Sequence, residues 1–435
     1  MERFALSRMK EWKENENRKP LIIRGARQVG KTWIMKTFGQ QYFEKTAYVN
    51  FDNNARMKQV FEGDLDIERL VLAISAETGV SIEAENTLII FDEVQEVPKA
   101  LTSLKYFHEN APQYAIVAAG SLLGVALHQG TSFPVGKVDF LDLYPLNFRE
   151  FLCAMGEKQF VSMLDSCDTQ MVTVFETKYI ERLREYYFVG GMPEVVKDFS
   201  EKKDYNRVRA IQKNLINYYQ QDFSKHAEIK LVPRLNLVWN SIPMQLAKEN
   251  KKYIYGQVRE GSRAKDFELA IQWLLDCGLI HKVQRIQKPD LPLKAYIDFD
   301  AFKLFLVDIG LLIAMTDLDA KVIIEGNKIF TEFKGSLTEQ YILQQLISDV
   351  GVIPYYYSTQ NSKGEIDFLV QGKTSVIPIE VKAEENLKAK SLKAFCEKYQ
   401  PSYAVRTSMS DYREQDWMTN IPLYAIKWIE NYVNQ

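Results

Sequence analysis

Cysteine is scarce in this sequence, and neither sign of charge dominates. The four cysteines among 435 residues form no C-x-x-C pair and no Cys/His cluster, so the sequence predicts neither a disulfide framework nor a zinc site. This usage fits a reducing compartment. The formal net charge is −2, which provides no global field for attracting nucleic acid.

Long hydrophobic runs and a targeting segment are missing as well. Residues 1–17 are charged throughout, so we expect no secretory signal. The longest apolar run, residues 302–315, is interrupted by Lys303 and Asp308, so we expect no membrane span and no membrane partner. We therefore predict a cytoplasmic protein, long enough for two to four domains.

A phosphate-binding pattern is present near the start of the chain. Residues 25–32 read Gly-Ala-Arg-Gln-Val-Gly-Lys-Thr, the G-x-x-x-x-G-K-[ST] loop, and they follow an apolar run at 21–23. Backbone N–H groups of such a loop and the N-terminus of the next helix bind phosphates. Lys31 is expected to reach the β- and γ-phosphates, and the Thr32 hydroxyl to hold Mg²⁺. The predicted nucleotide-binding residues are Gly25, Ala26, Arg27, Gln28, Val29, Gly30, Lys31, Thr32 and Trp33.

A second pattern supplies acids for phosphoryl transfer. The apolar run 88–91 ends in Asp92 and Glu93, the Walker B arrangement. Asp92 is expected to serve Mg²⁺ and Glu93 to activate water, with Lys31 and Ser121 as further catalytic candidates. The chain lacks an evident N-K-x-D guanine-reading motif, so ATP is expected over GTP.

The first third of the chain alternates strands with helices. This alternation predicts a parallel sheet with helices on both faces. The predicted strands are 21–24, 46–51, 88–92, 114–119 and 136–141.

The middle of the chain is helical and then changes character. Helices near 234–248 and 262–277 flank a short strand at 253–255, and 279–283 can pair with 295–298 as a hairpin. Helix, helix, hairpin is the order of a winged helix, although a generic small helical domain is the alternative. The residues expected to contact phosphates of DNA or RNA are Arg259, Arg263, Lys265, Lys282 and Arg285. A protein-docking surface would explain the same residues.

Two neighbouring strands near the C-terminus carry a second group of charged residues. Side chains alternate faces along a strand, so a hairpin of 364–370 with 377–382 can bring Asp367 close to Glu380 and Lys382. This arrangement resembles the PD-(D/E)xK nuclease site, in which acids hold a divalent metal. Such folds often place an additional acid on the preceding helix, and Glu339 takes that position here. The candidate metal ligands are therefore Glu339, Asp367 and Glu380. The candidate catalytic residues are Asp367, Glu380 and Lys382. Two amphipathic strands with a solvated charged face are the alternative.

Several further segments complete a family resemblance. They are Phe-Asp-Glu-Val-Gln at 91–95, Ala-Gly-Ser at 119–121, Tyr-Pro-Leu-Asn-Phe-Arg-Glu-Phe at 144–151, Gly-Gly-Met-Pro-Glu at 190–194 and Phe-Leu-Val-Asp-Ile-Gly-Leu-Leu at 305–312. With the loop and the two C-terminal strands, they resemble bacterial and archaeal ATP-binding proteins that pair an AAA+ module with a DUF4143 region.

This resemblance implies an α/β multidomain fold. The implied domains are a P-loop AAA+ ATPase domain at 1–150, a helical lid or linker at 151–231, a winged-helix-like domain at 232–315 and a restriction-endonuclease-like α/β domain at 316–435. One departure from the family pattern is Lys137, where relatives often carry Arg. The difference matters because Lys supplies a positive charge without the planar fork of the Arg side chain. Arg24 and Arg27, which flank or lie in the loop, are other candidates to act on a neighbouring subunit's nucleotide.

Three functions compete at this point. The first is an Mg²⁺-dependent ATPase acting on nucleic acid, with the C-terminal domain as a metal-dependent nuclease. The second is a nucleotide-gated docking or signalling ATPase that binds a protein partner and whose C-terminal acids are structural. The third, a nucleotide kinase, is weakest, because the chain is longer than a small kinase needs and has no evident lid arginine cluster.

Overall fold

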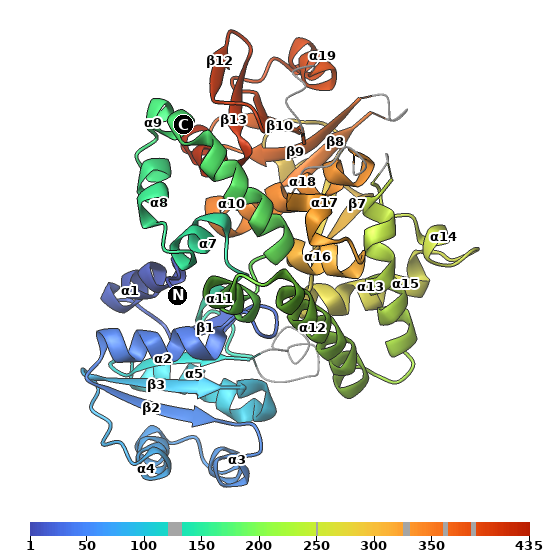
Figure 1. Cartoon of the computed structure of the whole chain (residues 1–435). Coiled ribbons are helices and arrows are strands. Elements are labelled where there is room, and N and C mark those ends of the chain that lie inside the picture. The colour runs from blue at the N-terminus through green and yellow to red at the C-terminus, as the bar shows by residue number, and fades with distance from the viewer. Residues whose placement is uncertain (121–132, 249–250, 325–330, 360–363, 384–388) are drawn as a thin grey trace. The chain divides into compact units, whose positions relative to one another are not determined.

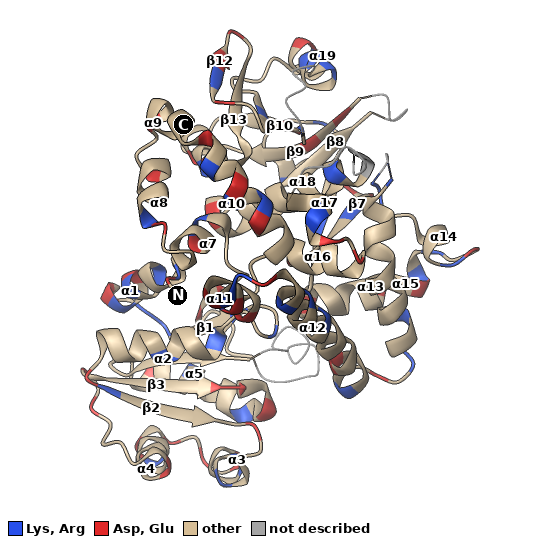
Figure 2. Cartoon of the chain, viewed as in Figure 1, with Lys and Arg blue, Asp and Glu red and all other residues tan. Residues whose placement is uncertain are grey.

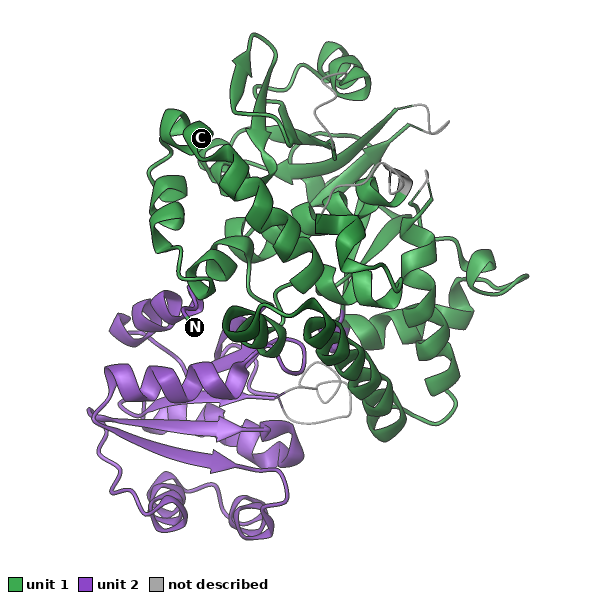
Figure 3. Ribbon diagram, in the orientation of Figure 1, with its two compact units in different colours: residues 1, 145–275, 280–435 green, residues 2–144, 276–279 purple. Residues whose placement is uncertain are grey.

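A computed structural model describes residues 1–120, 133–248, 251–324, 331–359, 364–383 and 389–435. The chain divides into two compact units (Figure 3). The P-loop unit consists of Glu2–Tyr144 together with Asp276–Leu279, and the large unit consists of Pro145–Leu275 and Ile280–Gln435 together with Met1. The four domains drawn from the sequence, with their boundaries, stay a prediction.

The P-loop unit is built on a five-stranded sheet in which every neighbouring pair is parallel. Its strands follow the order β2-β3-β4-β1-β5. They are β1 (Leu21–Arg24), β2 (Lys45–Asn50), β3 (Thr87–Asp92), β4 (Ala115–Ala119) and β5 (Asp139–Asp142). All residues of β3 and β4 are buried, as expected for central parallel strands that are covered on both faces. The predicted parallel sheet is confirmed.

Helices cover both faces of this sheet (Figure 1). They are α1 (Ala5–Glu14), α2 (Lys31–Tyr42), α3 (Ala55–Glu62), α4 (Ile67–Thr78) and α5 (Pro98–Asn110), with a 3₁₀ turn η1 (Val94–Glu96) after β3. Phe51, Phe61 and Phe91 pack edge to face with ring centroids 5.4–5.6 Å apart. They belong to one buried cluster with residues of α3, α4 and α5, so apolar burial fixes the helices on that face.

The large unit contains an eight-stranded mixed sheet of order β12-β13-β11-β10-β9-β8-β6-β7. Its strands are β6 (Ile280–Ile286), β7 (Ile297–Leu306), β8 (Tyr355–Ser358), β9 (Glu365–Gln371), β10 (Val376–Val381), β11 (Val405–Ser408), β12 (Arg413–Gln415) and β13 (Met418–Pro422). Strands β6 and β7 form an antiparallel pair, and β6 also pairs in parallel with β8. The middle segment and the C-terminal segment therefore share one sheet.

The helices of the large unit lie before, between and after these strands. They are α7 (Phe148–Ala154), α8 (Lys158–Asp165), α9 (Thr169–Val174), α10 (Glu176–Val189), α11 (Pro193–Lys202), α12 (Tyr205–His226), α13 (Val232–Leu246), α14 (Tyr255–Val258), α15 (Ala264–Asp276), α16 (Ile309–Met315), α17 (Ala320–Ile324), α18 (Thr331–Gln345), α19 (Lys390–Tyr399) and α20 (Glu430–Val433). Short turns are η2 (Leu293–Tyr296), η4 (Leu346–Val350) and η5 (Leu423–Ile429).

The segment expected to be a winged helix has the predicted helices and a longer hairpin than predicted. Helices α13 and α15 confirm the two expected helices, and β6 pairs with β7 over seven positions from Ile280↔Leu306 to Ile286↔Ile297. The predicted short strand at 253–255 is wrong, because helix α14 begins at Tyr255. The Tyr253 N–H donates to the Phe302 carbonyl of β7 at 2.8 Å. The winged-helix assignment itself stays a prediction.

Three of the sequence motifs meet at Asp308 in the core of the large unit. Asp308 caps α16 by accepting from the Leu311 N–H at 3.1 Å, and it accepts from the Gly191 N–H at 2.6 Å. A Cβ on Gly190 would lie 2.2 Å from the Asp308 carboxylate, and one on Gly191 would lie 2.1 Å from the Leu146 carbonyl oxygen. Burial raises the pKa of Asp308 to about 6, while these backbone donors act in the opposite direction. The motifs therefore have a packing role here.

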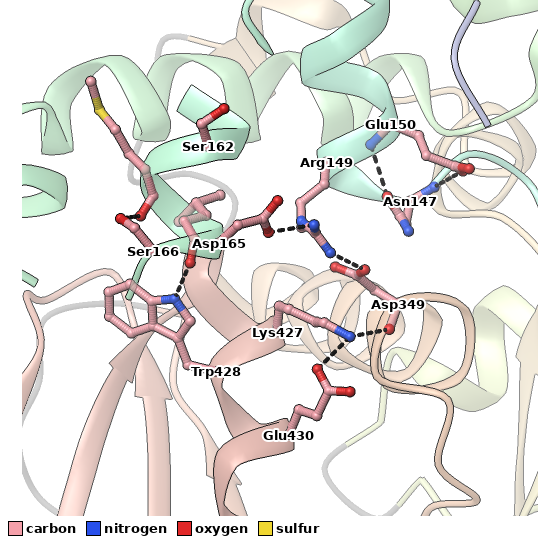
Figure 4. A network of polar contacts seen from close by, with 12 residues as sticks. Asn147, Arg149, Glu150, Ser162, Asp165, Ser166, Asp349, Lys427, Trp428 and Glu430 are labelled. Carbon is pink, nitrogen blue, oxygen red and sulfur yellow. Dashed lines mark hydrogen bonds and ion pairs between the residues drawn. The ribbon is translucent and has the colours of Figure 1, made fainter. Parts of the chain in front are cut away.

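The segment after Tyr144 is tied to the C-terminal part of the large unit (Figure 4). Asn147 and Glu150 form a capping box at the start of α7. Between them in sequence, Arg149 pairs with Asp165 and, at 2.9 Å, with Asp349. Lys427 donates to the Asp349 carbonyl at 3.0 Å. These contacts give the Asn-Phe-Arg-Glu residues at 147–150, part of the motif at 144–151, a structural role.

Candidate nucleotide site and C-terminal charge cluster

The predicted phosphate loop joins β1 to α2 in a conformation that needs glycine. Gly25 has φ +151°, and a Cβ there would lie 2.1 Å from the Leu143 carbonyl oxygen. Gly30, with φ 96°, caps the N-terminus of α2. Side chains other than hydrogen are strained in these positions. The loop is thereby closed over the first turn of α2, where helix N–H groups are available to an anion.

The Lys31 ammonium group lies inside the loop. Its Nζ donates to the carbonyl oxygens of Gly25 at 2.9 Å and Ala26 at 2.8 Å. Burial lowers the pKa of Lys31 to about 8, against the opposing effect of Glu93 and Asp92. A phosphate bound beside Lys31 would therefore favour the charged form of its ammonium group.

Asp92 lies at the end of β3 within reach of two hydroxyl groups. Its Oδ2 accepts from Thr32 Oγ1 at 2.6 Å and from Tyr48 Oη at 2.9 Å. Burial, and then the Asp92 carboxylate, raise the pKa of Tyr48 well above its usual value, so the phenol stays a donor. The sequence analysis missed Tyr48. The signal available was register, because β2 lies beside β3 with Asn50 opposite Asp92.

Glu93 follows in a left-handed conformation, with φ 52°. Its backbone N–H donates to Asp92 Oδ1 at 3.1 Å, and its carboxylate Oε2 accepts from Gln95 Nε2 at 2.7 Å. The left-handed turn and the Gln95 amide together fix the direction of the carboxylate. Gln95 is a second residue that the functional assignment missed, although it lies in the quoted motif. Ser121 lies outside the described residues.

The basic candidates for acting on a neighbouring nucleotide have partners within the P-loop unit. Arg24 forms a two-pronged pair with Asp142, at 2.8 and 3.0 Å, and lies over the Phe140 ring at 4.3 Å. Lys137 pairs with Glu109 at 3.0 Å.

Trp33, the last of the predicted nucleotide-binding residues, lies on the first turn of α2, and its side chain is 41% exposed.

The residues of this site fit a nucleotide with a divalent cation. The fit rests on the loop that a Cβ would obstruct, on a buried ammonium that donates to two loop carbonyls, and on hydroxyl and carboxylate oxygens 2.6 Å apart at Thr32 and Asp92. Oxygen atoms of this kind are the ligands that Mg²⁺ prefers.

In the large unit, a buried lysine lies among the predicted C-terminal acids. Lys303 on β7 is fully buried and pairs with Glu365, and at 3.5 Å with Glu339. Glu339 also pairs with Lys251. Burial lowers the pKa of Lys303, but Glu339 and Glu365 outweigh it and hold that pKa above its usual value. The cluster therefore contains its own compensating cations.

The other predicted members are divided between this cluster and the next strand. Burial and the nearby Glu339 raise the pKa of Asp367 to about 7. Asp367 accepts from the Val381 N–H at 2.7 Å, so it does reach the Glu-x-Lys segment. Glu380 pairs with Lys382 at 2.9 Å. Over the described ranges, no group of three or more His, Cys, Asp or Glu side chains is arranged to hold a metal; the assignment of metal ligands here stays a prediction.

Two of the basic residues expected to contact nucleic acid are engaged within the large unit. Arg285 pairs with Asp298, and Lys282 lies over the Phe302 ring at 4.3 Å. Figure 2 shows acidic and basic residues on the same helices, for example α10 and α12.

In the part of the chain that the structure describes, no helix is long and apolar enough to cross a membrane.

Comparison with known families places three matches along the chain. Residues 17–152 match the AAA domain family, residues 180–322 match a domain of unknown function, DUF8612, and residues 334–426 match another, DUF4143. The chain therefore carries an AAA domain over residues 17–152. More particularly, it combines an AAA domain with a C-terminal DUF4143 domain, as the sequence resemblance predicted.

Two solved structures show weaker similarity. The Walker-type ATPase PABY2304 of Pyrococcus abyssi has 15% identity and a TM-score of 0.44, covering 72% of this chain and 95% of its own. Cdc6p from Pyrobaculum aerophilum has 9% identity and a TM-score of 0.26, covering 74% of this chain and 93% of its own. No curated protein sequence matches the chain.

Proposed function

We propose that this protein binds ATP with Mg²⁺ and hydrolyses it at the site between β1, α2 and β3. The observation that carries the proposal is the contact of Thr32 with Asp92 at 2.6 Å beside the buried Lys31 and the oriented Glu93. These are the groups that phosphoryl transfer requires: a phosphate cradle, metal ligands and a residue that positions water.

Each residue has a defined part in this reaction. The amides of the loop and the Lys31 ammonium hold the phosphate chain, and Thr32 and Asp92 would hold Mg²⁺. When bound, Mg²⁺ neutralises charge on the phosphates. Glu93 orients a water molecule and accepts its proton as the water oxygen bonds to the γ-phosphorus. The bond from that phosphorus to the bridging oxygen breaks, which releases ADP and phosphate.

Phosphate release from ATP by the purified chain, with Mg²⁺ and with EDTA, tests this function. We expect turnover that requires the metal and that exceeds turnover of GTP. Turnover by Lys31→Ala equal to that of the parent would overturn the assignment of the site. Addition of single- and double-stranded DNA or RNA then tests whether nucleic acid is a partner, by a change in turnover.

For the C-terminal domain we propose a docking role rather than phosphodiester cleavage. The observation that favours this second reading is the ion pairing of Lys303 with Glu339 and Glu365, since an ammonium group already neutralises those carboxylates. The alternative, a metal-dependent nuclease using Asp367, Glu380 and Lys382, predicts nicking of supercoiled plasmid with Mg²⁺ or Mn²⁺. Nicking that Asp367→Ala abolishes would establish the nuclease and exclude the docking-only role.

A further inference from the structure

A distant segment of the chain belongs to the P-loop unit. Asp276–Leu279 group with Glu2–Tyr144, although they lie more than 130 residues away in sequence from Tyr144. Helix α15 ends at Asp276, and strand β6 begins at Ile280. Three residues, Cys277, Gly278 and Leu279, therefore separate a helix and a strand of the large unit.

Gly278 contacts the backbone of the phosphate loop. Its φ is +69°, and a Cβ on it would lie 3.1 Å from the Ala26 nitrogen and 3.5 Å from the Gly25 carbonyl carbon. Both are main-chain atoms, so no flexible side chain can move aside. Gly25 is also in contact with the Leu143 carbonyl, as described above. Backbone atoms of two other segments thus lie close to the first residues of the loop.

The neighbouring Cys277 gives an independent indication of proximity. Cys277 is buried, with 4% of its surface exposed. It is also among the groups whose charge acts on Lys31. Cys277 therefore lies near the Lys31 ammonium group.

Nucleotide binding changes the part of the loop that Gly278 contacts. Lys31 Nζ now donates to the carbonyls of Gly25 and Ala26. An ammonium group has three N–H donors, so pairing with two phosphate oxygens requires Lys31 to give up at least one of these bonds. Loss of the bond to the Gly25 carbonyl would leave the peptide between Gly25 and Ala26 without this partner. Because Gly278 packs on that peptide, the two events are mechanically linked.

We propose that Gly278 is a positioning residue for the phosphate loop and that segment 276–279 transmits nucleotide occupancy to α15 and β6. This inference rests on the proposed ATP site. Thermodynamic coupling is reciprocal: if nucleotide alters the segment, then a change in the segment alters nucleotide affinity by the same factor.

A matched pair of glycine substitutions tests the contact. Gly278→Ala adds a methyl group against the loop, whereas Gly261→Ala adds one at φ +75° with nothing within 4 Å. Both variants place alanine at a similar positive φ, but only the methyl group of Gly278→Ala meets other atoms within 4 Å. We expect Gly278→Ala to weaken binding of a fluorescent ATP analogue about tenfold, the usual scale of such coupling, and Gly261→Ala to leave it unchanged.

A second measurement reads the segment directly and does not depend on a variant that folds. Alkylation of Cys277, followed by mass spectrometry of the full-length parent, is compared with and without the analogue, with Cys396 as the internal reference. We expect nucleotide to change the Cys277 rate and leave the Cys396 rate alone. Equal affinity of Gly278→Ala and the parent, equal weakening by both glycine variants, or a Cys277 rate that ignores bound nucleotide would each overturn the proposal. Absence of binding by the parent would instead overturn the ATP site itself.

Discussion

The side-chain amide of Gln95 donates a hydrogen bond of 2.7 Å to the carboxylate of Glu93. The two residues are separated by one position, and η1, which begins at Val94, brings them together. The bond fixes the carboxylate of the expected base. Gln95 would therefore influence ATP hydrolysis by positioning the Glu93 carboxylate.

Gln95→Ala should lower kcat for ATP hydrolysis about tenfold while leaving KM nearly unchanged, because loss of orientation affects the reacting group and not the phosphate cradle. Steady-state kinetics measure both constants. Gln95→Glu, which places a second carboxylate beside Glu93, should be at least as slow. A rise in KM with constant kcat would mean that Gln95 acts on substrate binding.

Glu93→Gln keeps the shape of the side chain and removes the base. We expect it to bind ATP as the parent does and to hydrolyse ATP at least ~100-fold more slowly, the usual scale for a lost general base. Single-turnover phosphate release, with binding measured separately, separates the two steps. Parental turnover in this variant would move the base to another residue.

Nucleotide affinity should fall as pH rises past about 8, because burial sets the pKa of Lys31 near that value in the free protein. Phosphate favours the charged ammonium, so binding takes up a proton above that pH and becomes weaker there. Titration of binding from pH 7 to 10 measures the slope. Lys31→Ala should bind weakly with no such slope, and an unchanged affinity of the parent across this range would contradict the assignment.

Lys303→Met should destabilise the large unit by about 3–5 kcal/mol, because Glu365 loses its cation and the buried Glu339 loses one of its two cations. Chemical denaturation measures the change. Lys213→Met is a matched control, since Lys213 pairs with Asp317 at the surface and exposed pairs contribute little. If Lys303→Met instead gains Mn²⁺ binding that the parent lacks, the carboxylates can serve as a metal site once the lysine is removed.

Asp367→Asn should stabilise the protein above pH 7. The pKa of Asp367 is raised to about 7 in the folded state, so between about pH 4 and 7 the folded state binds more protons than the unfolded state, and stability falls as pH rises through this window. The amide oxygen of Asn can still accept from the Val381 N–H. Thermal unfolding from pH 4 to 8 should show a flatter profile for the variant, and identical profiles would contradict the raised pKa.

The loop and strand that carry the proposed nucleotide site were predictable because their sequence signals are local. The loop at 25–32 and the acids at 92–93 each adjoin a buried strand, and the alternation of strands with helices predicts a parallel sheet. Tyr48 and Gly278 were not predictable in the same way. Tyr48 reaches Asp92 only through the register of β2 against β3, and Gly278 reaches the loop across about 250 residues of chain.

The C-terminal cluster shows a different limit. Asp367 contacts the backbone of the Glu-x-Lys segment, and its convergence with Glu380 and Lys382 stays a prediction. Lys303 was noted only as an interruption of an apolar run, because a lysine in a hydrophobic strand gives no signal of its partners. Its pairing with Glu339 and Glu365 depends on how β7, α18 and β9 pack.

The shared sheet has a consequence for how this chain is made. Strand β6 leaves the ribosome about 70 residues before its parallel partner β8, so the edge of β6 that pairs with β8 stays bare until Tyr355–Ser358 have been synthesised. Bare strand edges are sites where chains join one another. We expect any nascent or truncated product that ends before β8 to expose this edge and therefore to be prone to aggregation or chaperone binding.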